Sequence, residues 1–290
     1  MAARGRLVHD HDVIAISIDG QLVAPDHATV SVLDRGFLYG DGLFEVLRTW
    51  DGVAVDLDAH LDRLFTSARW LQLQTIDRAA LAQAVLRTIA SAQTGGGVAD
   101  QRVRVVVTRG PGAIGTRLAE LGIGRAIVIV EPLPVQPTEL ALALVDWPLA
   151  RHVGAGHKTL AYLDHVIARE LAAAAGADEA VRLDAAGAVV EGATSNLFVV
   201  IAGRVTTPPV ETGALPGITR GRVLACCAEL GIPAATERVS VDALRAADEV
   251  FVTSALRGVV GATRLDGETR ALGPLTQRLA SAYIAMMRRK

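Results

Sequence analysis

Residues 176–198 read GADEAVRLDAAGAVVEGATSNLF, a segment in which short polar stretches alternate with strand-like runs. The runs lie around 180–183 and 197–200, and Glu191-Gly192 and Ser195-Asn196 fall between them. On both sides of this segment, similar runs alternate with amphipathic helical stretches. The chain is therefore expected to adopt an α/β (α+β) fold, and its 290 residues are enough for two domains.

The N-terminal part begins with a hairpin signal, Asp19-Gly20, and a second Asp-Gly turn follows at residues 51–52. Further on, apolar residues recur at three and four positions up to Leu73, which predicts a helix with Asp58 as its N-cap. The elements expected in this part are strands over 13–18, 21–24, 43–55, 102–108 and 126–131, and helices over 58–73 and 78–92.

The stretch EPLPVQP, residues 131–137, holds three prolines and is typical of a connector between domains. We therefore expect a small N-terminal α/β domain over 1–132, a linker over 133–138 and a larger C-terminal α/β domain over 139–290. The elements expected in the larger domain are strands over 139–146 and 249–253, paired strands over 180–183 and 197–200, and helices over 159–175, 218–230 and from 274 onward.

Composition and charge exclude several classes of protein. The formal net charge of −2 gives no reason to expect nucleic-acid binding. Cys226 and Cys227 are adjacent and cannot form an ordinary disulfide framework, and no apolar run is long enough to cross a bilayer. His9 and His11 are unsupported by other ligand residues, so no metal site is expected. A cytoplasmic protein without membrane contacts is the expectation.

Lys158 is conspicuous because the chain holds only two lysines, Lys158 and the last residue, Lys290, among 29 basic side chains. Arginine replaces lysine in most surface ion pairs, but it cannot form a Schiff base, because its guanidinium does not lose its proton. The bland alternative is a surface lysine that survived by chance. The rarity of the residue makes Lys158 a candidate for imine chemistry.

A phosphate site is indicated by Leu215-Pro216-Gly217-Ile218-Thr219-Arg220, which opens the helix expected from 218. Free backbone N–H groups and the positive end of the helix dipole meet there, beside a hydroxyl group. Ser254 and Ala255 end a strand and offer a second phosphate contact. Pyridoxal 5'-phosphate (PLP) needs a lysine, a phosphate-binding site and a carboxylate that keeps its ring nitrogen protonated. Glu191 is a candidate for this carboxylate.

In these residues and in several longer motifs, the chain resembles the class-IV aminotransferases, which are the fold-type-IV PLP enzymes. This family includes branched-chain and D-amino-acid aminotransferases, (R)-amine transaminases and aminodeoxychorismate lyase. The resemblance runs from about Asp19 to Asp266. Besides residues 176–198, it rests on RGFLYGDGLFE (35–45), HLDRL (60–64), HKTL (157–160), LPGITR (215–220) and DEVFVTSAL (248–256).

The resemblance implies a role for each matching residue. Lys158 would form the internal aldimine and then shuttle protons, Glu191 would pair with the pyridine nitrogen, and Arg63 would bind the phosphate. Leu215 would pack on the ring, and Tyr162 or Asn196 would orient the side of the ring that bears the hydroxyl. The residues expected to bind PLP are Arg63, Lys158, Tyr162, Glu191, Asn196, Leu215, Ile218, Thr219, Ser254 and Ala255. Those expected to line the substrate pocket are Tyr39, Phe44, Arg48 and Arg104.

Several of these residues also have ordinary structural explanations. Taken alone, Arg63 is a solvated helix arginine, Glu191 a carboxylate at a strand end and Thr219 a residue of a helix's first turn. Tyr39, Phe44 and Tyr162 could be core aromatics. Gly110–Gly115 fits G-x-G-x-x-G, but Gly122 and Gly124 leave under two turns of helix behind it, which disfavours a dinucleotide site.

The sequence motifs indicate the family more directly than they indicate which reaction the protein catalyses. We expect an aminotransferase that moves an amino group from an amino acid to a 2-oxo acid, with D-amino acids and (R)-amines among the expected donors. Ser254-Ala255-Leu256-Arg257-Gly258 looks more like the lyases, so aminodeoxychorismate lyase, which forms 4-aminobenzoate and pyruvate, is the alternative. A non-catalytic cofactor-binding dimer is the remote alternative. In relatives a second subunit completes the pocket, which implies a homodimer.

Overall fold

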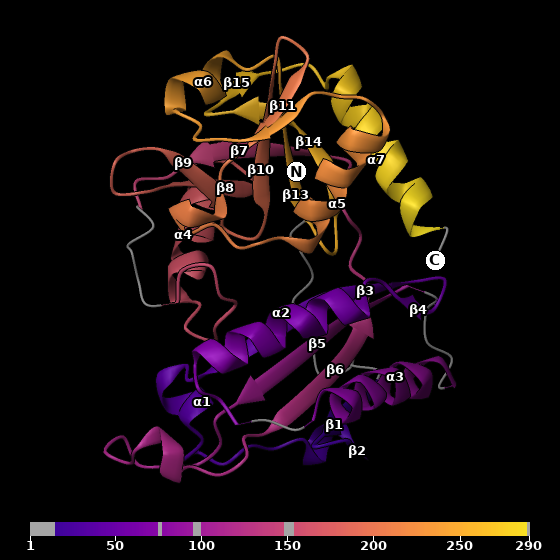
Figure 1. The fold of residues 1–290 in the computed structure, drawn as a ribbon, viewed down its shortest axis with the longest axis vertical. Helices are drawn as coiled ribbons and strands as arrows, with labels where there is room; N and C mark the ends of the chain where they lie inside the picture. The colour runs from indigo at the N-terminus through magenta and orange to yellow at the C-terminus, as the bar shows by residue number, and fades with distance from the viewer. Residues whose placement is uncertain (1–14, 75–76, 95–99, 148–153, 289–290) are drawn as a thin grey trace. The chain divides into compact units, whose positions relative to one another are not determined.

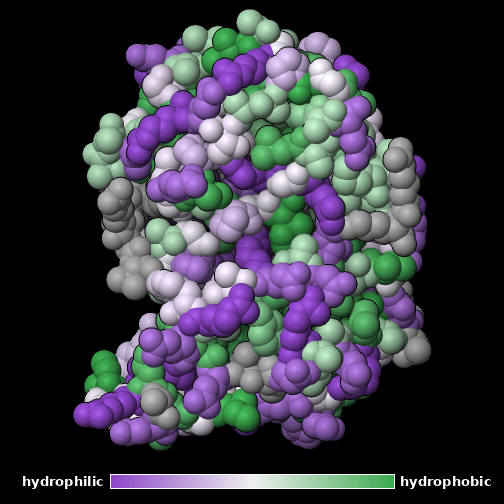
Figure 2. Space-filling view, viewed as in Figure 1, coloured by the Kyte–Doolittle hydropathy of each residue, from purple (hydrophilic) through white to green (hydrophobic). Residues whose placement is uncertain are grey.

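The fold is seen in a computed structural model that describes residues 15–74, 77–94, 100–147 and 154–288. It divides into two compact units, residues 1–134 and 135–290 (Figure 1). His9 and His11 lie outside the described residues. Hydrophilic and hydrophobic side chains are interspersed on the visible surface of each unit (Figure 2). Among the helices that are described, none combines the length and apolar character needed to span a bilayer.

Unit 1 is built on a six-stranded antiparallel sheet in the order β2-β1-β6-β5-β3-β4. Asp19 and Gly20 have positive φ in the turn of the first hairpin, as do Asp51 and Gly52 in the second, which is the conformation that Asp-Gly turns favour. The strands are β1 (Ala15–Ile18), β2 (Gln21–Val23), β3 (Gly42–Trp50), β4 (Val53–Ala54), β5 (Gln101–Thr108) and β6 (Ala126–Pro132).

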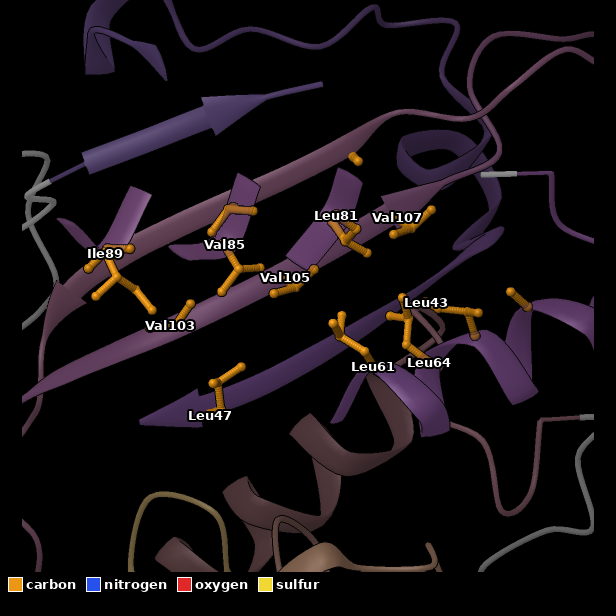
Figure 3. Packing of buried hydrophobic residues seen from close by; sticks show 14 of the residues in the cluster. Leu43, Leu47, Leu61, Leu64, Leu81, Val85, Ile89, Val103, Val105 and Val107 are labelled. Atoms are coloured by element: carbon orange, nitrogen blue, oxygen red, sulfur yellow. The ribbon is translucent and has the colours of Figure 1, made fainter. Parts of the chain in front are cut away.

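Helices α2 (Leu57–Trp70) and α3 (Arg78–Thr94) cover one face of this sheet, while the short α1 (Arg35–Tyr39) precedes β3. Alternate strand residues meet the two helices, because successive side chains of a strand point to opposite faces. Figure 3 shows their apolar side chains packed together. The buried residues labelled there are Leu43, Leu47, Leu61, Leu64, Leu81, Val85, Ile89, Val103, Val105 and Val107.

Unit 2 holds a mixed nine-stranded sheet in the order β12-β11-β10-β13-β14-β7-β8-β9, with β15 paired to β14. Strand β7 is parallel to both of its neighbours, whereas β8 and β9 form an antiparallel pair. The strands are β7 (Glu139–Leu144), β8 (Glu179–Leu183), β9 (Val189–Gly192), β10 (Asn196–Ile201), β11 (Arg204–Thr207), β12 (Ala234–Thr236), β13 (Glu249–Ser254), β14 (Gly258–Leu265) and β15 (Glu268–Thr269).

Four α-helices accompany the sheet of unit 2: α4 (Leu163–Ala174), α5 (Ile218–Glu229), α6 (Val241–Ala246) and α7 (Pro274–Met287). Strand β7 supplies two separate cores by alternation. Leu140 and Leu142 pack with Leu244 of α6, whereas Ala143 packs with Ala168 of α4. Strands β7, β8 and β9 are thus buried on both faces.

Two predicted helix starts are wrong. Helix α2 begins at Leu57, because the carbonyl of Asp56 already accepts from the N–H of His60, and Asp58 lies in the first turn, where it pairs with Arg78. The helix expected from 159 begins at Leu163, because the carbonyl of Tyr162 accepts its first hydrogen bonds. Lys158 therefore stands in a non-helical segment, five residues ahead of α4.

The predicted pairing of the runs around 180–183 and 197–200 is also wrong. Strand β8 pairs with β7 and β9, whereas β10 pairs with β11 and β13. The reason is that residues 189–192 form a strand of their own, β9, which turns back along β8 before the chain reaches β10.

Candidate active site

Lys158 is half-buried in a turn segment that is tied to the loop before α5. Gly156 has φ of 78°, a conformation that favours glycine, and its N–H donates to the carbonyl of Gly213 at 3.2 Å. The Nζ of Lys158 lies 5.4 Å from the centre of the Tyr162 ring. The lysine is thereby placed beside the loop that holds Leu215 and Pro216.

Glu191 occupies a buried position in β9, and its Oε2 accepts from the N–H of Leu215 at 2.9 Å and from Nδ2 of Asn196 at 3.4 Å. Burial raises the pKa of Glu191 to about 7, although the Leu215 N–H and the charges of Arg182 and Lys158 act in the opposite direction. The carboxyl group can therefore hold or release a proton near neutral pH.

Asn196 links Glu191 to the start of α5. Its Nδ2 also donates to the carbonyl of Leu215 at 2.9 Å. Gly217, the N-cap of α5, lies so close that a Cβ added there would stand 1.8 Å from Oδ1 of Asn196. Only glycine leaves room for this contact. Three of the predicted residues, Glu191, Asn196 and Leu215, are thus brought together by hydrogen bonds.

The N-terminus of α5 has no side-chain cap, and its first helical hydrogen bond runs from the N–H of Gly221 to the carbonyl of Gly217. The N–H groups of Ile218 and Thr219 precede that bond, at the positive end of a 12-residue helix. Thr219 is buried and Ile218 is half-buried. This end of α5 has the chemistry that a phosphate group requires.

Ser254 ends β13 and Ala255 begins the turn that leads to β14, and both residues are half-buried. Oγ of Ser254 accepts from the N–H of Arg257 at 3.3 Å. Arg257 in turn donates to the buried carboxylate of Glu179 at 2.9 Å. The turn that carries the two predicted phosphate contacts is therefore anchored to the start of β8.

Arg63 lies in unit 1, on α2, and forms a two-bonded ion pair with Glu45 of β3. Its Nε and Nη2 donate to the two carboxylate oxygens at 2.7 and 2.6 Å. His60 contacts the same carboxylate at 2.8 Å. The pKa of Glu45 is lowered to about 2 by Arg63 and His60, against the effect of burial. The motifs 35–45 and 60–64 thus meet in one buried cluster.

The four predicted pocket residues also lie in unit 1. Arg48 and Arg104 stand on neighbouring strands and, with Phe44, on the sheet face opposite to α2 and α3. Arg104 lies over the Phe44 ring at 5.0 Å, whereas Arg48 lies over Trp50 and pairs with Asp100 at 2.5 Å. Tyr39 ends α1 and is 44% exposed. Arg63 is on the helix-covered side of the sheet with Glu45.

Comparisons with known proteins decide the family. The family described as amino-transferase class IV matches residues 42–265. The chain belongs to this family. It is 34% identical to a putative branched-chain-amino-acid aminotransferase of Methanocaldococcus jannaschii and 32% identical to a D-alanine aminotransferase of Bacillus licheniformis. These matches cover 92% of this chain and 94% and 95% of the relatives.

Solved structures of class IV enzymes agree with this fold. A branched-chain aminotransferase of Thermoproteus uzoniensis superposes with a TM-score of 0.88 at 31% identity, over 95% of each chain. The 4-amino-4-deoxychorismate lyase of Pseudomonas aeruginosa gives 0.81 at 34% identity, over 92% of this chain and 97% of the lyase. The predicted family and fold type are confirmed, and so is an aminotransferase assignment at the level of the family.

Two residues that the sequence patterns did not single out lie beside the class IV site. Arg182, opposite Glu191 on β8, is fully buried, and its Nη1 lies 3.0 and 3.2 Å from the two ring nitrogens of His165. His165 stacks on Tyr162 with ring centres 4.1 Å apart. An arginine inside the otherwise apolar run AVRL was the available signal.

Residues that follow the Gly110–Gly115 motif form no α-helix. Between β5 and β6 the described chain has only the 3-10 helix Leu118–Glu120. The long helix that a dinucleotide site uses to bind a pyrophosphate is therefore missing from this loop. Within the described residues, no group of three or more His, Cys, Asp or Glu side chains is arranged to hold a metal ion.

Proposed function

We propose that this class IV family member is a PLP-dependent aminotransferase that transfers an amino group from an amino acid to a 2-oxo acid. The observation that carries the proposal is the arrangement in unit 2 of a lysine, Lys158, near a buried carboxyl group, Glu191, whose pKa is raised to about 7. A lysine near such a carboxyl group, with a helix N-terminus beside them, suits an imine-forming cofactor that bears a phosphate and a basic ring nitrogen.

The donor set of unit 2 fits PLP. Glu191 is held by Leu215 and Asn196 and would bind the ring nitrogen, while Leu215 would pack on the ring. The start of α5 and the Ser254-Ala255 turn would take the phosphate, for which Arg63 of unit 1 is also predicted. Tyr162, whose OH donates to the carbonyl of Ala193 at 3.2 Å, would orient the ring hydroxyl side.

The chemistry divides between cofactor and protein. When bound, PLP supplies a carbonyl carbon that condenses with amines and a ring that takes up an electron pair. Lys158 Nζ, once released by the substrate amine, would remove the substrate proton and return it at another carbon. Glu191, in its ionised form, would accept the N–H of the protonated ring nitrogen and so keep that proton on the ring. A lysine can do this because its amine, unlike a guanidinium, loses its proton.

The donor is the less determined part of the proposal. D-amino acids and (R)-amines remain the expected donors, and the similarity to a D-alanine aminotransferase supports the first of these. The similarity to a putative branched-chain-amino-acid aminotransferase supports L-leucine and related donors. Each donor class therefore has to be tested separately. The cytoplasmic location stays a prediction.

A second candidate function is that of an aminodeoxychorismate lyase. It is favoured by the sequence of the turn after β13, residues 254–258, and by the 34% identity with the lyase of Pseudomonas aeruginosa. A lyase would use the same Lys158 and Glu191 but would release pyruvate instead of exchanging the amino group with a 2-oxo acid.

The homodimer is proposed from an apolar surface around α1. Val32, Leu33, Phe37 and Leu38 are 71%, 63%, 69% and 44% exposed, although all four are large apolar side chains close together in sequence. Large apolar side chains that are exposed close together in sequence are typical of a subunit interface. A second copy of the chain is the proposed occupant.

The near-visible absorption spectrum tests the reaction. A yellow protein should lose its long-wavelength band with one of D-alanine, L-leucine or (R)-1-phenylethylamine and regain it with a 2-oxo acid. Lys158→Ala should abolish this response. A yellow protein that no donor bleaches, and that releases pyruvate from aminodeoxychorismate, would favour the lyase. Turnover of amino donor that persists in Lys158→Ala would contradict both.

A further inference from the structure

Arg182 is a buried charged residue that has no role in the proposed reaction. Its side chain is fully buried in β8, and within the described residues its Nε and Nη2 have no hydrogen-bond partner. Burying a guanidinium with unsatisfied donors is costly, and an apolar side chain of the same volume is often at least as stable there. Packing alone therefore gives no reason for an arginine at this position.

Arg182 lies next to two residues of the candidate active site, Glu191 and His165. Arg182 and Glu191 are directly opposite in the antiparallel pair of β8 and β9, so both side chains leave the same face of the sheet. Nη1 of Arg182 also reaches the His165 ring, at 3.0 Å from Nδ1 and 3.2 Å from Nε2. The arginine thus lies between the carboxyl group and the first turn of α4.

The Ala193 carbonyl fixes the position of one imidazole hydrogen. Nδ1 lies 2.7 Å from this carbonyl oxygen, which can only accept, so Nδ1 carries the hydrogen. Nη1 of Arg182 is almost equidistant from the two ring nitrogens, so it packs against the ring and does not lie on the lone pair of either nitrogen. The guanidinium and the Ala193 carbonyl together hold the orientation of the ring.

Tyr162 depends on the same arrangement. Its ring stacks on His165 with ring centres 4.1 Å apart and planes 4° apart, and its OH donates to the same Ala193 carbonyl at 3.2 Å. Lys158 Nζ lies 5.4 Å from that ring. A contiguous set of contacts therefore runs from Arg182 through His165 and Tyr162 to the reactive lysine.

We infer that Arg182 is a positioning residue of the active site, which fixes Tyr162 through His165 and places a positive charge beside Glu191. The inference rests on the proposed function for its catalytic consequence, but its structural part concerns the chain alone. The positive charge of Arg182 lowers the pKa of Glu191, against the larger effect of burial. The guanidinium keeps this charge when buried.

The test compares Arg182→Met, which removes charge and donors at similar volume, with Arg182→Lys, which keeps the charge. Arg182→Met should lower kcat about tenfold or more and change KM for the donor by less than about threefold. Arg182→Lys should recover most of the lost kcat. Apo Arg182→Met should unfold at the same or a higher urea concentration than wild type, because a buried unsatisfied charge is gone. Arg270→Met is the matched control, since Arg270 also has a buried Nε without partner but lies after β15.

Two further readouts separate this inference from the proposed function. In the apoprotein, ¹⁵N NMR should show His165 protonated at Nδ1 in wild type and changed ring ¹⁵N shifts in Arg182→Met, because the guanidinium packs against that ring. In kinetics, His165→Phe should lower kcat, and the double variant should lose less than the sum of the two single effects. Wild-type turnover within twofold in Arg182→Met, or a loss of kcat matched by loss of folded protein, would overturn the inference. If the wild type neither binds PLP nor accepts a donor, the proposed function fails while the NMR comparison still decides the role of Arg182.

Discussion

The side chains on which the chemistry depends differ in how far the sequence reveals them. Lys158 is conspicuous by its rarity, and Glu191 belongs to a recognisable motif. His165 carries no such mark, and Arg182 is marked only by its place in the apolar run AVRL, because their importance lies in register and stacking, which sequence spacing does not show. The environment of Glu191 was equally hidden, since its raised pKa comes first from burial.

Glu191 should make the stability of the apoprotein depend on pH in a defined direction. Its pKa is about 7 when folded and ordinarily 4.5, so the folded state binds the extra proton between these values. The contribution of Glu191 to the free energy of unfolding should therefore be highest below pH 4.5 and fall as pH rises to 7, by about 3 kcal/mol. Urea unfolding of the apoprotein measures it, with Glu191→Gln as reference. A wild-type-minus-variant difference that is constant between pH 4.5 and 7 would contradict the assignment.

Arg104 should discriminate carboxylate-bearing donors from simple amines. It shares a sheet face with Phe44 and matches a pocket position of the class IV enzymes. Arg104→Ala is expected to raise KM for amino acids about tenfold and to spare (R)-1-phenylethylamine. For Arg48→Ala the expected effect is smaller, because Asp100 already compensates the Arg48 charge. Equal changes in KM for both donor classes in Arg104→Ala would remove it from carboxylate binding.

Among the elements, segments with an uninterrupted apolar pattern were predicted better than a strand that contains glycines or a very short helix. Helices α3, α5 and α7 and strands β5, β6 and β13 agree with the expected ranges to within about two residues, as boundaries from periodicity usually do. Strand β14 and helix α6 were missed. Gly258 and Gly261 weaken the strand signal of β14, and α6 has only six residues, too few for helical periodicity to emerge.

The start of α5 can be tested with two glycines of the same element. Gly217→Ala places a Cβ 1.8 Å from Asn196 Oδ1 and should displace both Asn196 and the first turn. We expect affinity for PLP to fall about tenfold or more, measured by equilibrium dialysis. Gly221→Ala meets nothing within 4 Å and should instead stabilise the helix by about 0.5–1 kcal/mol without weakening PLP binding. Equal PLP affinity of Gly217→Ala and wild type would refute this account of the helix start.

At the scale of the whole chain, the boundary between the two compact units falls between residues 134 and 135, inside the proline-rich segment 131–137. The candidate residues, whose roles come from the class IV resemblance, divide between the two units. Lys158, Glu191 and the α5 start are in unit 2, whereas Arg63 and the four pocket residues are in unit 1. Composition alone does not show this division.

The proposed homodimer predicts a mass in solution of twice that of the 290-residue chain. Phe37→Asp places a charge on the apolar surface around α1, where Phe37 is 69% exposed, and should shift the protein toward the monomer. Val135→Asp is the control, because Val135 is 99% exposed and lies outside that surface. Analytical ultracentrifugation measures both variants. A wild-type monomer at micromolar concentration, or a Phe37→Asp dimer as tight as wild type, would contradict the proposal.

The most direct test of the central claim is chemical labelling of Lys158. Holoprotein is treated with borohydride, digested and mapped by mass spectrometry, with Lys158→Arg, which keeps the charge, as the control. Because an arginine guanidinium forms no imine that borohydride can reduce, the phosphopyridoxyl mass should appear on Lys158 alone and be absent from the variant. A label on Lys290 or the N-terminus instead, or no label on a protein that has bound PLP, would contradict the account.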